Sequence, residues 1–426
     1  MIAALLALHL ITGPVPAVIY SVGAALFVVL MISQRWRAWL PIAISVIVIG
    51  LVVGLIVCWI LGDLLNLFGV TLSFASRAWF AVSVAGFALG IARGIFERKR
   101  LTVIGSFGAV SLLLVGLIGL NADLGEFPNL GNALGVGAYR QLAIPATRAH
   151  STITPAVTQV MPTVGRIGTV DIPGIVSHFS ARPAIVYLPP AALLPHPVAL
   201  PVIIMLSGQP GGPSDLFIKG QMQATLDVYA HAHNGLAPIV VDADQLGAPA
   251  YNPMCLDSAL GNAATYLTVD VPNWIKSHLT VRTGATNWAI GGFSEGGTCA
   301  IQLGSSYPGI FGAIVDISGE VAPFRGSVQN TIAVAFHGSL AAYRAAIPAN
   351  IQKAHGTYSD SFALFTIGGS DLRYGPGLRA TERTAAFHKM QTQLFVSPGT
   401  AHDWRTVAYA LNQSIPVISS HWGLSG

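Results

Sequence analysis

The sequence predicts an all-α region of four transmembrane helices, followed by an α/β domain with a doubly wound, mostly parallel sheet. Three observations predict this class. Only 9% of the 426 residues are charged, against about 25% in ordinary soluble domains. Four long apolar stretches lie in the first 120 residues. Beyond them, short β-rich runs alternate with helical stretches, as in βαβ units. We therefore expect a membrane region, an extracytoplasmic connector and an α/β domain at residues 1–120, 121–164 and 165–426.

The apolar stretches are the expected membrane spans. They lie at about residues 16–33, 41–62, 75–96 and 101–120. Each approaches or exceeds the roughly 18–20 residues that a helix needs to cross a bilayer core. A secretory signal peptide would be a single apolar run with a cleavage site. Charges are nearly absent from the spans, which favours a passive anchor over a transporter or channel regulated by the outer domain. Residues 1–12 could extend the first span or lie at the interface.

Basic residues in short loops predict the orientation, because such loops stay cytoplasmic. Arg35 and Arg37 follow the first span, and the loop between the second and third spans has only Asp63 and Arg77. The remaining basic residues lie between the third and fourth spans, at Arg93, Arg98, Lys99 and Arg100. We therefore expect a multi-pass protein of the plasma membrane with both termini and the α/β domain outside the cytoplasm.

The charge distribution also bears on partners. The net charge of +4 comes partly from these basic loops. Because no basic run interleaved with aromatic residues occurs, we expect no nucleic-acid partner. The bilayer is the partner that the composition predicts.

The connector at 121–164 is rich in proline, glycine, alanine and threonine, as in "STITPAVTQVMPTVG". Such a composition with weak periodicity is typical of a partly ordered stalk.

Nine short runs, several of them continuously apolar, are expected to be strands. A continuous apolar run that ends in glycine, aspartate or serine is typical of a strand buried on both faces of a parallel sheet. The expected strands are at 168–174, 183–190, 200–208, 237–244, 287–292, 311–319, 331–338, 362–369 and 391–399. The expected helices between them are at 214–233, 263–279 and 294–308.

The chain has three cysteines. Cys58 lies in the second span, where a small apolar residue is the plain interpretation. Cys255 and Cys299 lie in the outer domain, where oxidising conditions permit a disulfide. The sequence leaves open whether these two form a bridge or remain two buried thiols.

Ser294 is the candidate nucleophile. It is the serine of the G-x-S-x-G motif in "GGFSEGG", between an expected strand and an expected helix. A nucleophile elbow requires this strand–turn–helix setting, and flanking glycines allow its strained turn. The alternative is one more glycine turn in a chain with 46 glycines.

A serine hydroxyl needs a base, and in this arrangement the order along the chain is serine, acid, histidine. His402 in "SPGTAHDW" follows the last expected strand and is the candidate base. We expect His337 and His388 to be structural, and His355 and His421 to lie at the surface.

Asp371 is the candidate acid, because it follows the penultimate expected strand. There it could accept the imidazole N–H and stabilise the imidazolium. An aspartate that caps a turn or helix is the plain alternative. The other acidic candidates are Glu382, Asp316, Glu320 and Asp403.

The oxyanion of an acyl-transfer reaction needs two N–H donors. One is expected from the backbone of Glu295, the residue after the nucleophile, and the other from the loop after an earlier strand. "MLSGQPGG" ends such a strand, and Gln209 N–H is the expected donor, with Gly208 as the neighbouring choice. An ordinary Gly/Pro turn is the alternative.

From about 165 to 410 the chain resembles the esterase D / antigen 85 (mycolyltransferase) branch of the α/β-hydrolases. "LPVIIMLSGQPGG" resembles the opening strand and oxyanion loop of that family, "NWAIGGFSEGGTCAIQL" its elbow, and "GTAHDW" its histidine segment. The resemblance implies an α/β-hydrolase fold with Ser294 as nucleophile, His402 as base, and Gln209 and Glu295 as oxyanion donors.

The position of the acid separates two branches of this family. Mycolyltransferases carry it on a helix after the penultimate strand, where Glu382 would fit, whereas the esterase D type has an aspartate at the strand end, where Asp371 fits. This favours ester hydrolysis. The multi-span region resembles that of membrane-anchored esterase-like proteins of actinobacteria.

The expected function is a membrane-anchored serine esterase that cleaves a carboxylic ester of a lipid or cell-envelope substrate through an acyl-enzyme. No metal or organic cofactor is expected. The alternatives are an acyltransferase that passes the acyl group to a sugar or lipid hydroxyl, and a catalytically inactive envelope-binding module. Neither the acyl group nor the oligomeric state can be read from the sequence.

Overall fold

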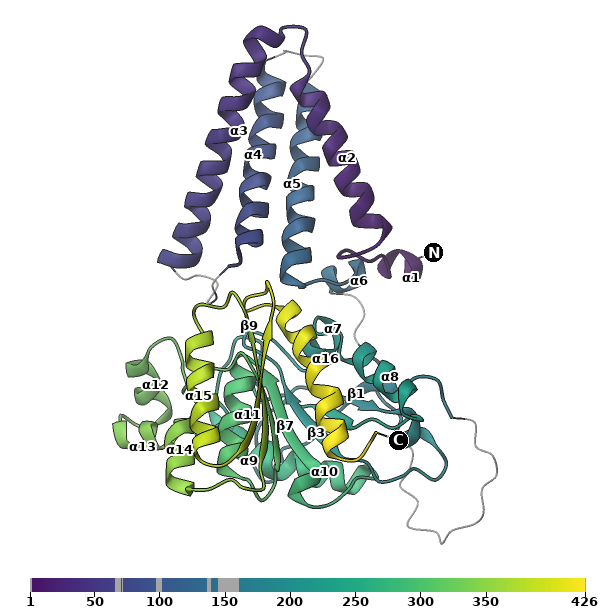
Figure 1. The fold of residues 1–426 in the computed structure, drawn as a ribbon, viewed down its shortest axis with the longest axis vertical. Helices are drawn as coiled ribbons and strands as arrows, with labels where there is room; N and C mark the ends of the chain where they lie inside the picture. The colour runs from purple at the N-terminus through teal and green to yellow at the C-terminus, as the bar shows by residue number, and fades with distance from the viewer. Residues whose placement is uncertain are drawn as a thin grey trace. The chain divides into compact units, whose positions relative to one another are not determined.

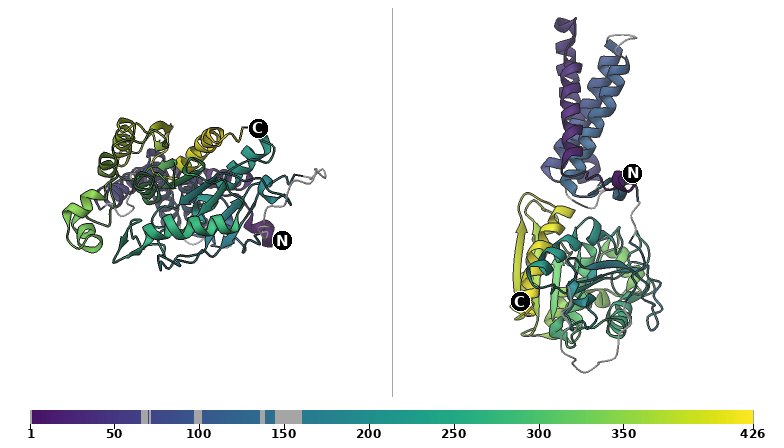
Figure 2. Two further views of the ribbon diagram at one scale, coloured as in Figure 1. Left: turned by 90° about the horizontal axis from the view of Figure 1, so that it is seen from below. Right: turned by 90° about the vertical axis from the view of Figure 1, so that its right-hand side faces the viewer.

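A computed structural model describes residues 2–65, 70, 72–96, 102–135, 139–144 and 161–425. The chain divides into two compact units, drawn in Figures 1 and 2. One comprises Met1–Gly137 with Thr400–Arg405, and the other Ala138–Gly399 with Thr406–Gly426. The predicted basic residues Arg98, Lys99 and Arg100 lie outside the described residues, as do residues 145–160 of the predicted connector.

The first unit contains four helices that are long and apolar enough to cross a membrane, which confirms the expected all-α region. They are α2 (Pro14–Met31), α3 (Trp36–Trp59), which continues through the π-helical turn η1 (Ile60–Leu64), α4 (Phe74–Phe96) and α5 (Thr102–Leu124). The short helices α1 (Ile2–Leu6) and α6 (Leu130–Ala133) complete the unit. A turn at Gly13, with φ of 90°, separates α1 from α2, so the first residues do not extend the first long helix.

Small residues let the long helices approach closely. A methyl group built on Gly54 of α3 would lie 2.6 Å from Cα of Ala81 in α4. One built on Gly90 of α4 would lie 2.5 Å from the backbone nitrogen of Ala109 in α5. Backbone contact of this kind is how helices associate in apolar surroundings, where lipid offers no hydrophobic driving force.

The helices carry more charge than the sequence pattern suggested. Arg93 lies inside α4 rather than in a loop; it is buried, donates to the carbonyl oxygen of Ile32 and has its guanidinium 5.0 Å from the centre of the Trp39 ring. Asp123 lies in α5 and accepts hydrogen bonds from the hydroxyls of Ser76 and Ser73. The charges are buried and partnered near helix ends, where hydrogen bonds offset their desolvation.

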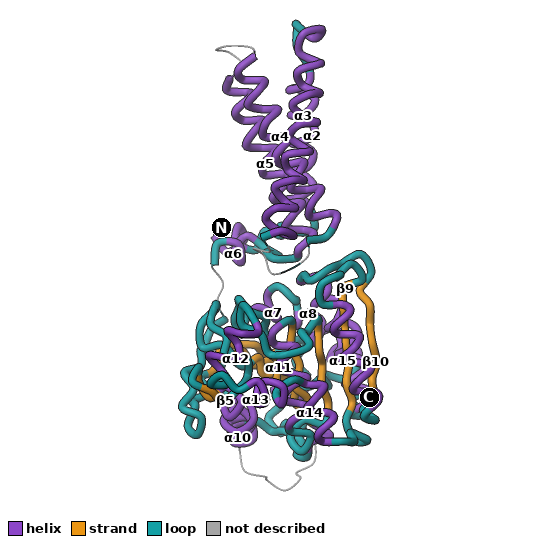
Figure 3. The backbone as a smooth tube through the Cα atoms, turned by 90° about the vertical axis from the view of Figure 1, so that its left-hand side faces the viewer, coloured by secondary structure: helices purple, strands orange, loops and turns teal. Residues whose placement is uncertain are grey.

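The second unit is built on an eight-stranded sheet in the order β1-β2-β4-β3-β7-β8-β9-β10. Its strands are drawn in orange in Figure 3. β2 pairs antiparallel with both β1 and β4, and the other pairs are parallel, which confirms the expected mostly parallel sheet. The strands are β1 (Arg166–Val170), β2 (Ala184–Leu188), β3 (Val202–Leu206), β4 (Ile239–Asp242), β7 (Trp288–Phe293), β8 (Ala313–Ile317), β9 (Phe362–Gly368) and β10 (Gln391–Ser397). Every residue of β2, β3, β4, β7 and β8 is buried, which explains their continuous apolar runs.

Helices and turns connect these strands. The helices are α7 (Asp215–Ile218), α8 (Met222–Ala232), α9 (Ala263–Thr265), α10 (Val271–His278), α11 (Glu295–Ser306), α12 (Val328–Ala335), α13 (Leu340–Ala345), α14 (Pro348–His355), α15 (Gly375–Phe387) and α16 (Trp404–His421). Shorter elements are η2 (Pro190–Leu193), η3 (Tyr266–Asp270), η4 (Ala285–Asn287) and the hairpin of β5 (Asp257–Ser258) and β6 (Gly261–Asn262). Helix α11 packs on β3, β7 and β8 and so begins at the middle of the sheet.

One expected strand was wrong. Residues 331–335 of this expected strand belong to helix α12, and residues 336–338 lie at and beyond its end. Ser327 caps the helix, because its side chain accepts from the backbone N–H of Asn330. Gly338, with φ of 80°, follows its end. A short apolar run does not distinguish strand from helix, whereas a serine cap and a closing glycine favour a helix.

Two described parts of the expected connector, around residues 128–130 and 140–142, form backbone hydrogen bonds with other segments. Leu10 N–H donates to Pro128 O and Leu130 N–H donates to Leu8 O, within the first unit. In the second unit Leu142 N–H donates to Thr169 O, and Thr169 N–H donates to Arg140 O. Residues 140–142 therefore lie along the outer edge of β1.

Candidate active site

Ser294 occupies a strained turn at the centre of the sheet. It follows β7 directly and precedes the first residue of α11. Its φ of 58° and ψ of −115° are rare for a residue with a side chain. Its N–H donates to Ile317 O at 2.8 Å, and its carbonyl oxygen accepts from Thr298 N–H at 2.9 Å. The surrounding backbone therefore holds the half-buried serine in the conformation of a nucleophile elbow.

The two motif glycines are required by close packing. A methyl group built on Gly292 would lie 2.5 Å from the backbone carbonyl of Gly296. One built on Gly296 would lie 2.2 Å from Leu206 O at the end of β3. Side chains at these positions would push α11 away from the strands, so the glycines bring the helix and Ser294 close to the sheet.

The loop after β3 lies beside the serine. A methyl group built on Gly208 would be 3.4 Å from Cβ of Ser294. The neighbouring Gln209 is held by its side chain, whose amide donates to Ala250 O at 3.1 Å. Gly208 and Gln209, the two sequence-predicted choices for the second oxyanion donor, therefore both belong to a segment that passes the candidate nucleophile.

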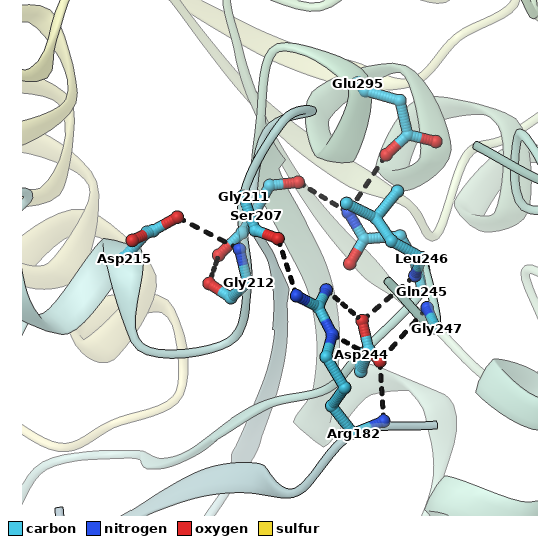
Figure 4. A network of polar contacts seen from close by, with 10 residues as sticks. All are labelled: Arg182, Ser207, Gly211, Gly212, Asp215, Asp244, Gln245, Leu246, Gly247 and Glu295. Atoms are coloured by element: carbon cyan, nitrogen blue, oxygen red, sulfur yellow. Dashed lines mark hydrogen bonds and ion pairs between the residues drawn. The ribbon is translucent and has the colours of Figure 1, made fainter. Parts of the chain in front are cut away.

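A polar network holds this loop (Figure 4). The Ser207 hydroxyl donates to Gly212 O at 2.6 Å, and Gly212 N–H donates to Asp215 Oδ2 at 3.0 Å. The side-chain amide of Gln245 donates to Ser207 O at 2.5 Å and to Glu295 Oε2 at 2.9 Å. The network thus connects the loop after β3 to the residue that follows Ser294.

The carboxyl group of Glu295 is kept neutral by its surroundings. Burial raises its pKa to about 8, and the nearby carboxyl groups of Glu320 and Asp244 add to the rise, whereas the hydrogen bond from Gln245 acts in the opposite direction. Its Oε1 lies 3.0 Å from Sγ of Cys299. An uncharged carboxyl beside the proposed oxyanion donor avoids repulsion of a developing negative charge.

The structure joins Cys255 and Cys299 by a disulfide, with the two Cα atoms 5.6 Å apart. The two sulfurs and a carboxyl oxygen of Glu295 lie within 4.8 Å of one another. Because the sulfurs are bonded to each other, the pair offers no thiolates for a metal ion. The disulfide instead fixes α11 to the segment before β5.

Asp371 lies three residues beyond the end of β9 and is buried. Its Oδ1 accepts from the N–H groups of Arg373 and Tyr374 at 3.1 and 2.9 Å. The turn-capping role that the sequence left open is therefore present. A catalytic role is compatible with these contacts, because the same backbone hydrogen bonds fix the direction in which the carboxyl group points.

His402 lies between β10 and α16 and is 8% exposed. The next residue, Asp403, accepts from Ala401 N–H at 2.8 Å and so orders the backbone around the histidine. Ser294 and Asp371 follow the carboxyl ends of the parallel strands β7 and β9, and His402 follows β10 along the chain. In parallel sheets functional residues gather at this edge.

Two other acidic candidates are less suited to the role. Glu382 of α15 accepts from the hydroxyl of Thr392 at 2.6 Å. Thr392 is the second residue of β10, so Glu382 lies at the opposite edge of the sheet from Ser294. Asp316 is buried within β8; burial raises its pKa to about 8, and its Oδ1 accepts from Gly319 N–H. A neutral carboxyl stabilises an imidazolium poorly, so Asp371 is the better candidate.

Three of the remaining histidines contact other parts of the second unit. The His388 ring nitrogen contacts Gly356 O at 2.8 Å, His355 stacks on Tyr358, and His421 stacks on Phe362 at the start of β9. Glu320, another of the acidic candidates, lies three residues beyond the end of β8; burial raises its pKa to about 6, and the nearby Arg373 guanidinium acts to lower it.

Sequence reasoning did not find Gln245, Asp244 or Arg182. They lie after β4 and before β2, and belong to no motif. The position of Gln245 could have marked it. It lies three residues beyond the buried strand β4, whose carboxyl end lies at the same edge of the sheet as those of β3 and β7.

Comparisons with known proteins show the family and the fold of the chain. A family model described as "Putative esterase" matches residues 180–395, which are 216 of the 426 residues. An uncharacterized protein of Corynebacterium glutamicum is 33% identical over 254 residues, which cover 58% of this chain and 59% of that protein. The match therefore spans less than two thirds of the relative's length.

Two solved structures share the fold of the second unit. A ferulic acid esterase is 15% identical with a TM-score of 0.52, over 61% of this chain and 98% of that chain. An S-formylglutathione hydrolase from Agrobacterium tumefaciens is 19% identical with a TM-score of 0.51, over 63% of this chain and 99% of that chain. At such identities the likeness shows the fold alone, which is the α/β-hydrolase fold.

Proposed function

Because this chain belongs to the family described as "Putative esterase", we propose that it is a membrane-anchored serine esterase acting on a lipid or cell-envelope ester. The observation that carries the proposal is the backbone of Ser294, strained at φ 58° and ψ −115° between β7 and α11. A fold retains such strain only where the surrounding structure enforces it, and functional sites are where it gathers.

The proposed reaction forms an acyl-enzyme. Ser294 Oγ attacks the ester carbonyl carbon while His402 takes the hydroxyl proton, and Asp371 accepts the imidazole N–H. The carbonyl oxygen of the ester becomes an oxyanion, which the N–H groups of Gln209 and Glu295 stabilise. The tetrahedral intermediate then expels the alcohol, which receives its proton from His402. Water attacks the acyl-enzyme by the same steps in reverse and releases the acid.

The substrate class rests on the first unit. Its four long apolar helices suit a bilayer anchor, and with the predicted orientation the hydrolase unit would work outside the cytoplasm. Esters within reach of an anchored enzyme are those of lipids and of the envelope. Transfer of the acyl group to a sugar or lipid hydroxyl uses the same acyl-enzyme and differs only in the acceptor.

The test is fluorophosphonate labelling of membranes that contain the wild-type protein, Ser294→Ala or His402→Ala. We expect labelling of the wild type alone, because an activated serine is required. Asp371→Asn should label at least about tenfold more slowly, whereas Glu382→Gln, at the opposite sheet edge, should label like the wild type. An unlabelled wild type beside a reactive control hydrolase would overturn the proposal in favour of a binding module.

The reaction products distinguish ester hydrolysis from acyl transfer. Membranes labelled with a radioactive acyl ester should release free acid if water is the acceptor. Appearance of the label in a sugar or lipid ester, dependent on Ser294, would instead identify an acyltransferase.

A further inference from the structure

We propose that Gln245 is a positioning residue that sets both oxyanion donors at once, by joining the loop after β3 to the side chain of Glu295. This inference rests on the proposed function, because it concerns the same site. Gln245 would touch neither substrate nor the reacting atoms, and would act through the two segments that it joins.

The side-chain amide of Gln245 has two N–H groups, which donate hydrogen bonds to two acceptors. One acceptor is Ser207 O at 2.5 Å, and the other is Glu295 Oε2 at 2.9 Å. A backbone carbonyl only accepts hydrogen bonds, so the group that faces Ser207 must be the NH₂ and not the oxygen of the amide. Gln245 is 1% exposed, so water does not compete for either bond.

The two acceptors belong to the two segments that carry the proposed donors. Ser207 O is part of the peptide unit that leads into Gly208 and Gln209, so its direction affects where the next N–H groups point. Glu295 supplies the other donor from its backbone. Oxyanion donors act at about 2.7–3.1 Å from the charge, so a small rotation of either segment weakens the site.

Gln245 is itself rigidly held (Figure 4). The preceding Asp244 accepts from the N–H groups of Leu246 and Gly247, both at 3.1 Å, and forms an ion pair with Arg182 at 2.7 Å. A second nitrogen of the same guanidinium donates to Gly211 O at 2.9 Å. The loop after β3 is thus held at its start by Gln245 and near its end by Arg182.

The chain provides a matched control in Gln302. This side chain lies on α11, is 3% exposed, and its amide also donates to two carbonyl oxygens, those of Met254 and Cys255 at 3.3 and 3.2 Å. It contacts neither Ser207 nor the Glu295 side chain in any described hydrogen bond. Replacing either glutamine by methionine keeps the shape of the side chain and removes two buried donors.

The experiment compares Gln245→Met, Gln302→Met, Ser294→Ala and the wild type as full-length proteins in detergent. Hydrolysis of p-nitrophenyl butyrate gives kcat and KM after subtraction of the Ser294→Ala rate, and thermal unfolding gives the loss of stability. We expect Gln245→Met to lower kcat about 10- to 100-fold with KM changed less than about threefold, because the loss is confined to the transition state. Gln302→Met should keep kcat within about threefold of the wild type at a similar loss of stability.

Equal kcat values for the two methionine variants would overturn the inference and leave the esterase proposal intact. A rise of KM by about 10- to 100-fold with unchanged kcat in Gln245→Met would also overturn the inference, because it would indicate a role in substrate binding. A wild-type rate no higher than that of Ser294→Ala would instead remove the proposed function, and this inference with it.

Discussion

The two motif glycines that flank Ser294, Gly292 and Gly296, have no room for a methyl group. The flanking glycines allow β7, the end of β3 and the first turn of α11 to meet at backbone distance. The hydroxyl of Ser294 is therefore placed by glycines that have no chemistry of their own, and their substitution should be as damaging as that of a catalytic residue.

Gly296→Ala should destabilise the hydrolase unit by about 1–3 kcal/mol, because the added carbon would meet Leu206 O at 2.2 Å and force the helix or strand to shift. Gly309→Ala is the control, since a methyl group there meets nothing within 4 Å. It should be neutral or stabilise by up to about 1 kcal/mol. Chemical unfolding followed by tryptophan fluorescence measures both. Equal stabilities would contradict the close packing described for the elbow.

Activity should fall as the pH rises past about 8, where the Glu295 carboxyl loses its proton. Below that pH the group is neutral; above it, a negative charge lies close to the proposed oxyanion and raises the transition-state energy. Glu295→Gln keeps a neutral side chain at every pH, so its kcat should stay constant as the pH rises past about 8. The test is the pH dependence of kcat for p-nitrophenyl butyrate in both proteins. An identical alkaline decline would assign that decline to another group.

The role of a single residue could be predicted from the sequence where the residue belongs to a motif. Ser294 could be found because glycines, a strand and a helix surround it in the sequence. Gln245 could not, since its partners Ser207 and Glu295 are 38 and 50 positions away, and a hydrogen bond between loops of different strands has no local pattern.

At the scale of elements, the disulfide joins helix α11 to the segment before β5 across 44 residues. A bridge over such a span restricts the unfolded chain. It also holds the second turn of α11, the helix that follows Ser294, next to the Glu295 side chain.

Reduction of the disulfide should lower the free energy of unfolding of the hydrolase unit by about 2–4 kcal/mol. Thermal unfolding with and without dithiothreitol measures the change. A Cys255→Ala/Cys299→Ala double variant should be insensitive to the reductant. Cys58→Ala, which removes the free cysteine of α3, should respond as the wild type does. If dithiothreitol did not change the thermal unfolding midpoint of the wild type, the result would contradict a stabilising disulfide.

Elements buried on both faces were the ones the sequence predicted well. The strands β3, β4, β7 and β8 are continuous apolar runs because every residue in them is covered. Helix α12 was mistaken for a strand because its run is as short and as apolar as theirs, and only the flanking Ser327 and Gly338 distinguish it.

At the scale of the whole molecule, Arg35 and Arg37 predict the orientation, because basic short loops remain in the cytoplasm. Alkaline phosphatase fused after Gly426 should be active and a fluorescent protein fused there should be dark, whereas fusions after Gln34 should behave in the opposite way. Charge reversal with Arg35→Glu and Arg37→Glu should weaken the contrast. The reverse reporter pattern in the unaltered protein would place the hydrolase unit in the cytoplasm.

The pairing of residues 140–142 with β1 has a practical consequence for where the hydrolase unit can be cut. β1 is the last strand of its sheet, and without these residues its outer edge would offer unpaired N–H and C=O groups to any passing strand. A soluble fragment that begins at 165, the boundary expected from composition, should therefore form aggregates through strand addition. One that begins at 139 should remain monodisperse in size-exclusion chromatography, since it carries its own cover for the exposed edge.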